Sequence, residues 1–124
     1  MNPADLFRHS NDTIDAAPGQ HIFRQGDKGD VMYVLLEGSV DLLVGDRLVE
    51  TAQSGALLGE MALIDATPRS ASAIAKSPCK LVGIDQKRFH FLIQQTPNFA
   101  THVLKVLAGR LRNTDRMFVA AEKS

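Results

Sequence analysis

The strongest constraint on the fold is a series of short β-type runs, separated by turn signals, between residues 13 and 85. Val31–Leu36 is an almost continuous apolar run, which predicts a central, buried strand. Gly45-Asp46 separates two further runs as a two-residue hairpin signal. Many short strands at even spacing predict a mainly β fold such as a sandwich, jelly roll or barrel. The predicted strands are 13–15, 21–24, 31–36, 39–44, 47–52, 72–75 and 80–84.

Helical signals flank this β region on both sides. Asn2 can cap a short first helix, which is predicted to end near residue 9. Asp85 can cap a second helix, Gln86–Gln95, whose apolar residues fall on one face. A last helix is predicted over Asn98–Ala121.

Length and charge narrow the classes of protein to which the chain can belong. Its 124 residues are enough for one domain, predicted over residues 1–124. The 14 basic and 14 acidic residues balance, which argues against a general nucleic-acid-binding surface. Cys79 is the only cysteine, which is typical of the reducing cytoplasm. No basic and apolar leader opens the sequence, and no apolar run approaches the roughly 18 residues that would span a membrane. We therefore expect a cytoplasmic protein without nucleic-acid partner or membrane insertion.

The sequence contains no constellation for catalysis or metal binding. Its four histidines lack the spacing of metal ligands, and no nucleophile lies in a recognisable catalytic motif. We therefore expect no enzymatic activity, no metal and no other cofactor.

One segment between the predicted strands combines the groups that hold a small anion and a hydroxyl. Gly59 permits close approach of backbone to a ligand, and the amides of Met61 and Ala62, at the start of a short helix, favour an anion. Arg69 offers a fork of donors that suits phosphate oxygens. The Glu60 carboxylate can accept from a sugar hydroxyl. Phosphate and ribose groups on adjacent walls of one pocket indicate a nucleotide.

Two segments also resemble a known family. Gly59-Glu60-Met61-Ala62-Leu63, followed by Arg69-Ser70-Ala71, is similar to the phosphate-binding cassette of cyclic nucleotide-binding domains. Gly26–Val40 is similar to the first hairpin of the same family, which includes the catabolite activator protein and protein kinase A regulatory subunits. The resemblance implies an eight-stranded β-roll (jelly roll) with a short N-terminal helix and two C-terminal helices that form a moving lid.

The resemblance also implies a role for each cassette residue. Arg69 would anchor the cyclic phosphate, and Glu60 would accept the ribose 2′-hydroxyl. Ser70 would reach the phosphate or a purine amino group, so it leaves the choice between cAMP and cGMP open. Met61 and Ala62 would complete the phosphate cradle with their amides.

Structural alternatives to the two charged roles remain. Arg69 would then be a surface arginine paired with Glu60 or Asp65. Glu60 would then satisfy the amides of the short helix.

Contacts to the base are expected from the last helix. Thr114 and Asp115 fall where family members hydrogen-bond the adenine amino group, and the carboxylate would favour adenine over guanine. The alternative contact is Arg110, with Leu111 beside it, or Arg112, since an arginine can stack on the base. A third reading is that these residues form a solvated, charged face.

Two hypotheses of function follow from these residues. In the first, the chain is a stand-alone sensor that binds a cyclic nucleotide, cAMP in preference to cGMP, and moves its C-terminal helices to regulate an unknown effector protein. In the second, it is a protein-interaction or dimerisation module with a vestigial pocket. That module would act through a leucine seam on the last helix, as a homodimer or with another chain, unless these leucines, Leu104, Leu107 and Leu111, pack on the β-roll.

Overall fold

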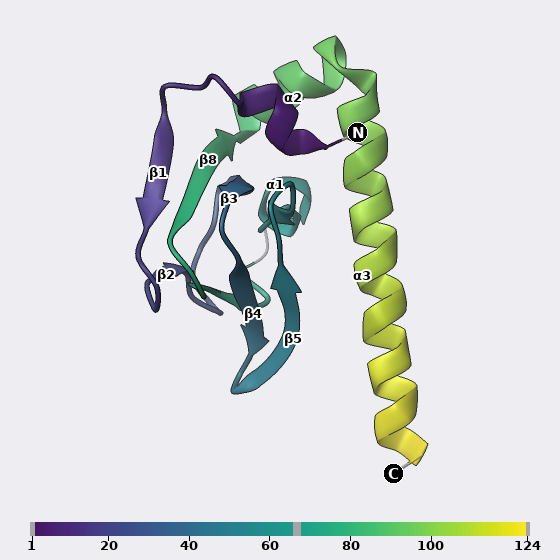
Figure 1. The fold of residues 1–124 in the computed structure, drawn as a ribbon. Helices are drawn as coiled ribbons and strands as arrows, with labels where there is room; N and C mark the ends of the chain where they lie inside the picture. Colours follow the sequence, from purple (N-terminus) through teal and green to yellow (C-terminus); the bar gives the residue numbers. More distant parts are fainter. Residues whose placement is uncertain (1, 66–67, 124) are drawn as a thin grey trace.

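Two four-stranded antiparallel sheets form the body of the protein (Figure 1). The computed structural model describes residues 2–65 and 68–123, with side chains described for residues 2–64 and 68–110. Within that part of the chain, the first sheet has the strand order β1-β8-β3-β6 and the second has the order β2-β7-β4-β5. The strands are β1 Thr13–Ala16, β2 His21–Phe23, β3 Val31–Glu37, β4 Val40–Val44, β5 Arg47–Ala52, β6 Leu57–Leu58, β7 Ser72–Ala75 and β8 Cys79–Asp85.

Helices lie at one end and along one side of this roll (Figure 1). They are the 3₁₀ helix η1 Pro3–Phe7, the short α1 Met61–Asp65, and the C-terminal α2 Gln86–Gln95 and α3 Pro97–Lys123. The prediction of a mainly β protein of eight strands, with one short N-terminal and two C-terminal helices, is therefore confirmed. The two-residue strand β6 was not among the predicted strands, and the first helix is shorter than predicted.

The apolar run that predicted a central strand forms β3, which pairs with β8 on one side and β6 on the other. Met32, Val34 and Leu35 are fully buried because β3 has both faces covered. The hairpin predicted at Gly45 joins β4 to β5, and Gly45 has the positive φ of 60° that such a turn requires.

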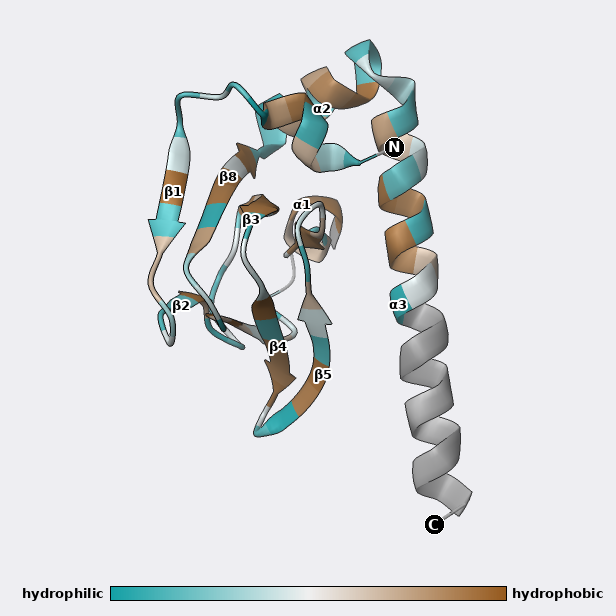
Figure 2. Cartoon of the chain, in the orientation of Figure 1, coloured by the Kyte–Doolittle hydropathy of each residue, from teal (hydrophilic) through white to brown (hydrophobic). Residues whose placement is uncertain are grey.

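The core has two parts. One lies between the sheets and includes Leu35, Leu58 and Leu81. The other lies between the first sheet and the helices, where Phe89 of α2 packs edge-on against Phe99 of α3. Figure 2 shows the hydrophobic residues concentrated on the strands, on α2 and on the first turns of α3.

The first turns of α3 attach this helix to the roll. Phe99 and Val103 are buried, and Leu107 packs against the same core. Leu104 in contrast is 66% exposed, so the first two leucines of the predicted seam do not share one environment. Leu111, the third, lies outside the described side chains. Among the described residues, no helix is both long and apolar enough to cross a membrane.

Candidate functional site

The segment that is predicted to bind the anion begins as a tight connection from β6 through Gly59 into α1. Gly59 has a φ of 73°, and a Cβ built there would lie 2.3 Å from Nη1 of Arg69. Only glycine therefore allows the Arg69 guanidinium to lie against this turn. The Ala62 amide, an expected part of the anion cradle, donates to the Gly59 carbonyl at 3.2 Å.

Arg69 is buried, with 7% of its surface exposed, which does not fit the reading of a surface arginine. Its backbone bonds to the β2–β3 loop, where the Arg69 amide donates to the Asp27 carbonyl at 2.8 Å and the Gly26 amide donates to the Arg69 carbonyl at 2.8 Å. The guanidinium donates to the carbonyls of Gly59 at 3.2 Å and Val31 at 2.6 Å. These acceptors are neutral.

No carboxylate lies at ion-pairing distance from Arg69 among the described residues. Burial lowers the pKa of Arg69, and the nearby Tyr33, Asp30, Asp27 and Glu60 oppose that shift only in part. The site therefore holds a buried cation without a direct counter-ion among the described residues, which do not include the side chain of Asp65.

Glu60 is the complementary group, a carboxylate that is only 2% exposed. Its Oε1 accepts a hydrogen bond from Nη1 of Arg110. Its Oε2 is buried and has no hydrogen-bond partner among the described residues. An unsatisfied buried acceptor is costly, so a ligand hydroxyl that donates to Oε2 would be favoured.

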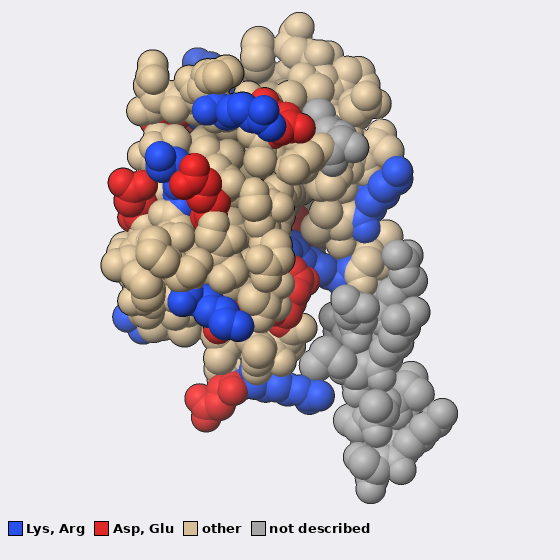
Figure 3. All heavy atoms as spheres, viewed as in Figure 1, with Lys and Arg blue, Asp and Glu red and all other residues tan. Residues whose placement is uncertain are grey.

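Arg110 connects α3 to the site. Besides Glu60, it donates to the Leu57 carbonyl at 2.8 Å and approaches Oε2 of Glu50 at 3.3 Å. Burial alone would lower the pKa of Arg110, but the charge of Glu60 and hydrogen bonds to Glu60 and Glu50 outweigh it, so this pKa is raised. In Figure 3, basic and acidic side chains meet where α3 faces the roll.

The other predicted site residues are only partly placed. Ser70 is exposed next to Arg69, and Met61 is 40% exposed at the start of α1. Arg110 lies against Glu60 instead of an open surface. Three predicted base contacts, Leu111, Thr114 and Asp115, lie outside the described side chains.

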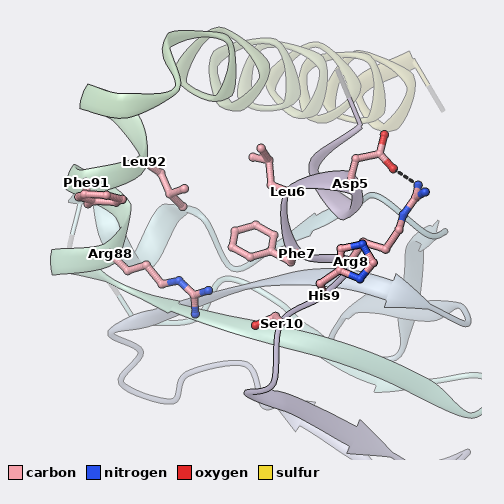
Figure 4. A pocket seen from close by; sticks show the side chains of 9 residues that line it. All are labelled: Asp5, Leu6, Phe7, Arg8, His9, Ser10, Arg88, Phe91 and Leu92. Carbon is pink, nitrogen blue, oxygen red and sulfur yellow. Dashed lines mark hydrogen bonds and ion pairs between the residues drawn. The ribbon is translucent and has the colours of Figure 1, made fainter.

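A separate pocket of about 400 Å³ lies between η1 and α2 (Figure 4). Leu6, Phe7, Phe91 and Leu92 supply its apolar walls, and Arg88 lies over the Phe7 ring at 5.0 Å. None of the described residues of the Gly59–Arg69 segment lines it. Within the described part of the chain, no three His, Cys, Asp or Glu side chains gather in a way that could hold a metal ion.

Comparison with known proteins gives a consistent result. Residues 13–96 match the family model described as "Cyclic nucleotide-binding domain". A cAMP-dependent protein kinase regulatory subunit from Eremothecium gossypii is 40% identical over 75 residues, which are 60% of this chain and 16% of the relative. The cAMP-activated global transcriptional regulator CRP from Pasteurella multocida is 37% identical over 101 residues, 77% of this chain and 48% of the relative.

The fold agrees with these matches. The structure of the Thermus thermophilus catabolite activator protein superimposes with a TM-score of 0.74 at 34% identity, over 83% of this chain and 51% of that one. The chain thus spans about half or less of the length of these three proteins.

Proposed function

The chain belongs to the family of cyclic nucleotide-binding domains, and on that basis we propose that it is a sensor for a cyclic nucleotide, cAMP in preference to cGMP. The observation that carries the proposal is the pair of buried, incompletely matched charges at the cassette. Within the described part of the chain, Arg69 has only neutral acceptors, and Glu60 keeps one oxygen without a partner. A cyclic phosphate would supply the anion that Arg69 lacks, and a ribose 2′-hydroxyl would supply the donor that Glu60 lacks.

The preference for cAMP rests on the last helix and on the relatives. Asp115 carries a carboxylate that can accept from the adenine amino group, and Thr114 precedes it. The Eremothecium gossypii and Pasteurella multocida relatives both carry cAMP in their names. Arg110, with Leu111 beside it, is the alternative contact to the base, and Ser70 would reach the phosphate or the purine.

The proposed output is a movement of α2 and α3 that an effector protein recognises. Arg110 supports this coupling because it bonds α3 to Glu60, the same carboxylate that is proposed to receive the ribose. A ligand hydroxyl that donates to Oε2 of Glu60 would share this carboxylate with Arg110, which bonds to Oε1. The ligand can shift the position of α3 only by its difference in affinity for the two arrangements.

The test of binding is calorimetric titration with cAMP and with cGMP. The parent is expected to bind cAMP more tightly than cGMP. Arg69→Ala should weaken cAMP binding by about 2–5 kcal/mol, since it removes one partner of a buried, charge-assisted contact. Arg47→Ala, which removes an exposed arginine, is the matched control and should bind like the parent. Equal affinity of the Arg69→Ala protein and the parent would reject the proposed phosphate anchor.

Dimerisation through α3 is the second candidate function. The observation in its favour is Leu104, a large apolar side chain that is 66% exposed directly after the buried Val103. Sizing of the parent and of Leu104→Gln, with and without cAMP, tests it. A monomer under all conditions would reject the dimer and leave the sensor proposal intact.

A further inference from the structure

The Arg69 guanidinium lies on an aromatic ring. Its Cζ is 4.3 Å from the centroid of Phe23, the last residue of β2. A cation over the face of a ring is attracted by the negative centre of the π-system. No carboxylate lies at ion-pairing distance from Arg69 in the described residues, so this ring and the carbonyl oxygens of Gly59 and Val31 are the negative groups in contact with the charge.

Two glycines, which have no side chain, lie against the same guanidinium. A Cβ built on Gly29 would lie 2.2 Å from Nε of Arg69. A Cβ built on Gly59 would lie 2.3 Å from Nη1 and 3.3 Å from the Phe23 ring. The guanidinium therefore occupies a slot whose floor is an aromatic ring and whose edges are bare backbone.

Phe23 is itself held in place by a second ring. Tyr33 of β3 stacks on it with centroids 6.2 Å apart and ring planes at 21°. The β2 strand has only three residues, and its pairing with β7 shifts register between His21 and Phe23. The stack on Tyr33 thus fixes the orientation of a side chain that comes from a short, irregular strand.

We propose that Phe23 is a positioning residue for the nucleotide phosphate, because it holds the Arg69 guanidinium flat and compensates its charge before an anion arrives. This role rests on the proposed function of Arg69 as phosphate anchor. The flat orientation leaves the edge of the guanidinium available for an in-plane contact with phosphate oxygens. An aliphatic side chain at position 23 would fill the volume of the ring, but it would neither attract the Arg69 charge nor fix the orientation of the guanidinium.

The variants separate the ring from the volume that it fills. Phe23→Leu and Phe23→Met remove the ring and keep apolar bulk, whereas Phe23→Tyr keeps the ring. The first two should weaken cAMP binding by about three- to thirty-fold, the range expected for a partly buried cation–π contact. Phe23→Tyr should stay within about twofold of the parent. Phe91→Leu, on the exposed surface of α2, is the control and should bind like the parent.

A second measurement needs no ligand. The Nε–H resonance of Arg69, observed by NMR, should be shifted upfield by the ring in the parent and in Phe23→Tyr. It should lose that shift in Phe23→Leu and Phe23→Met. Thermal melting of every variant identifies any that fails to fold. If one of the two aliphatic variants does not fold, the other still tests the proposal.

The outcomes are distinguishable. If the parent binds no cyclic nucleotide, the proposed function fails, and the role of Phe23 fails with it. If the parent binds and the folded aliphatic variants bind as tightly, Phe23 has no positioning role while the proposed function stands. Equal losses in Phe23→Tyr and Phe23→Leu would also overturn the proposal, because volume or shape would then explain the effect.

Discussion

Gly59 combines two structural demands in one residue. Its φ of 73° is in the region that side chains other than glycine rarely adopt, and its missing Cβ leaves the space in which Nη1 of Arg69 lies. Gly45 offers an internal comparison, since its φ is 60° but nothing lies within 4 Å of a Cβ built there. The two positions thus separate backbone strain from steric exclusion.

The prediction at this position compares Gly59→Ala with Gly45→Ala. Gly45→Ala should cost about 1 kcal/mol of unfolding free energy from backbone strain alone, and should leave nucleotide binding unchanged. Gly59→Ala should cost at least about twice as much and should also weaken binding, because Arg69 must move. Chemical denaturation and calorimetry measure the two effects. Equal destabilisation of both variants, with binding intact, would show that the close approach to Arg69 is unimportant.

The residue types of the site could be predicted from the sequence, but their partners could not. The chemistry and spacing of one short segment identify Gly59, Glu60 and Arg69 as candidate site residues. The contacts of Glu60 with Arg110 and of Arg69 with Phe23 join residues about 50 positions apart. No local pattern encodes such pairs, because they depend on how sheets and helices pack.

At the scale of elements, α3 contributes both buried apolar side chains and a charged contact to the roll. Its first turns bury Phe99 and Val103, and Arg110 then bonds back to Glu60 and to Leu57 of β6. His102 lies on the same turns, partly buried. Burial lowers the pKa of His102, and the positive charge of Lys105 adds to that effect.

This shift predicts a pH dependence of stability. A histidine whose folded-state pKa is lowered binds its proton more readily in the unfolded state. Its contribution is therefore full above the unfolded value of about 6.5 and is lost as the pH falls towards the lower folded value. We expect a small fall in Tm between pH 7 and pH 5.5 that His102→Gln removes. His90→Gln, at an exposed position of α2, should retain the fall. A slope that persists in His102→Gln would assign it to other groups.

Elements with strong repeating patterns were predictable, and short ones were not. β3 and α2 have continuous or periodic apolar residues, and they occur where the sequence predicts them. β6 has two residues, Leu57 and Leu58, which are too few to show an alternation. They form a strand only because β3 offers them a paired edge.

At the scale of the molecule, the proposed pocket lies between the roll and one long helix. Arg110 crosses this boundary and bonds to residues of β5, β6 and the cassette. A nucleotide bound there would contact both parts, so its binding would change the surroundings of α3 as well as those of the roll.

Hydrogen exchange tests this coupling. Addition of cAMP should slow amide exchange in α3 and in the cassette, because both would be covered by ligand contacts. The central strand β3 should exchange at the same slow rate with or without ligand, which provides the internal control. Unchanged exchange in α3, with calorimetric binding proven in the same sample, would reject the movement of the last helix.

The pairing of β1 with β8 has a consequence for how the chain is made. Thr13 lies opposite Val82, and β2 likewise pairs with β7, so neither early strand has its partner until most of the domain has left the ribosome. At roughly 5–20 residues per second, this wait lasts several seconds, during which Ile14 and its neighbours remain unpaired. The roll therefore closes only after β7 and β8 have been synthesised, and until then the nascent chain presents open strand edges that chaperones would recognise.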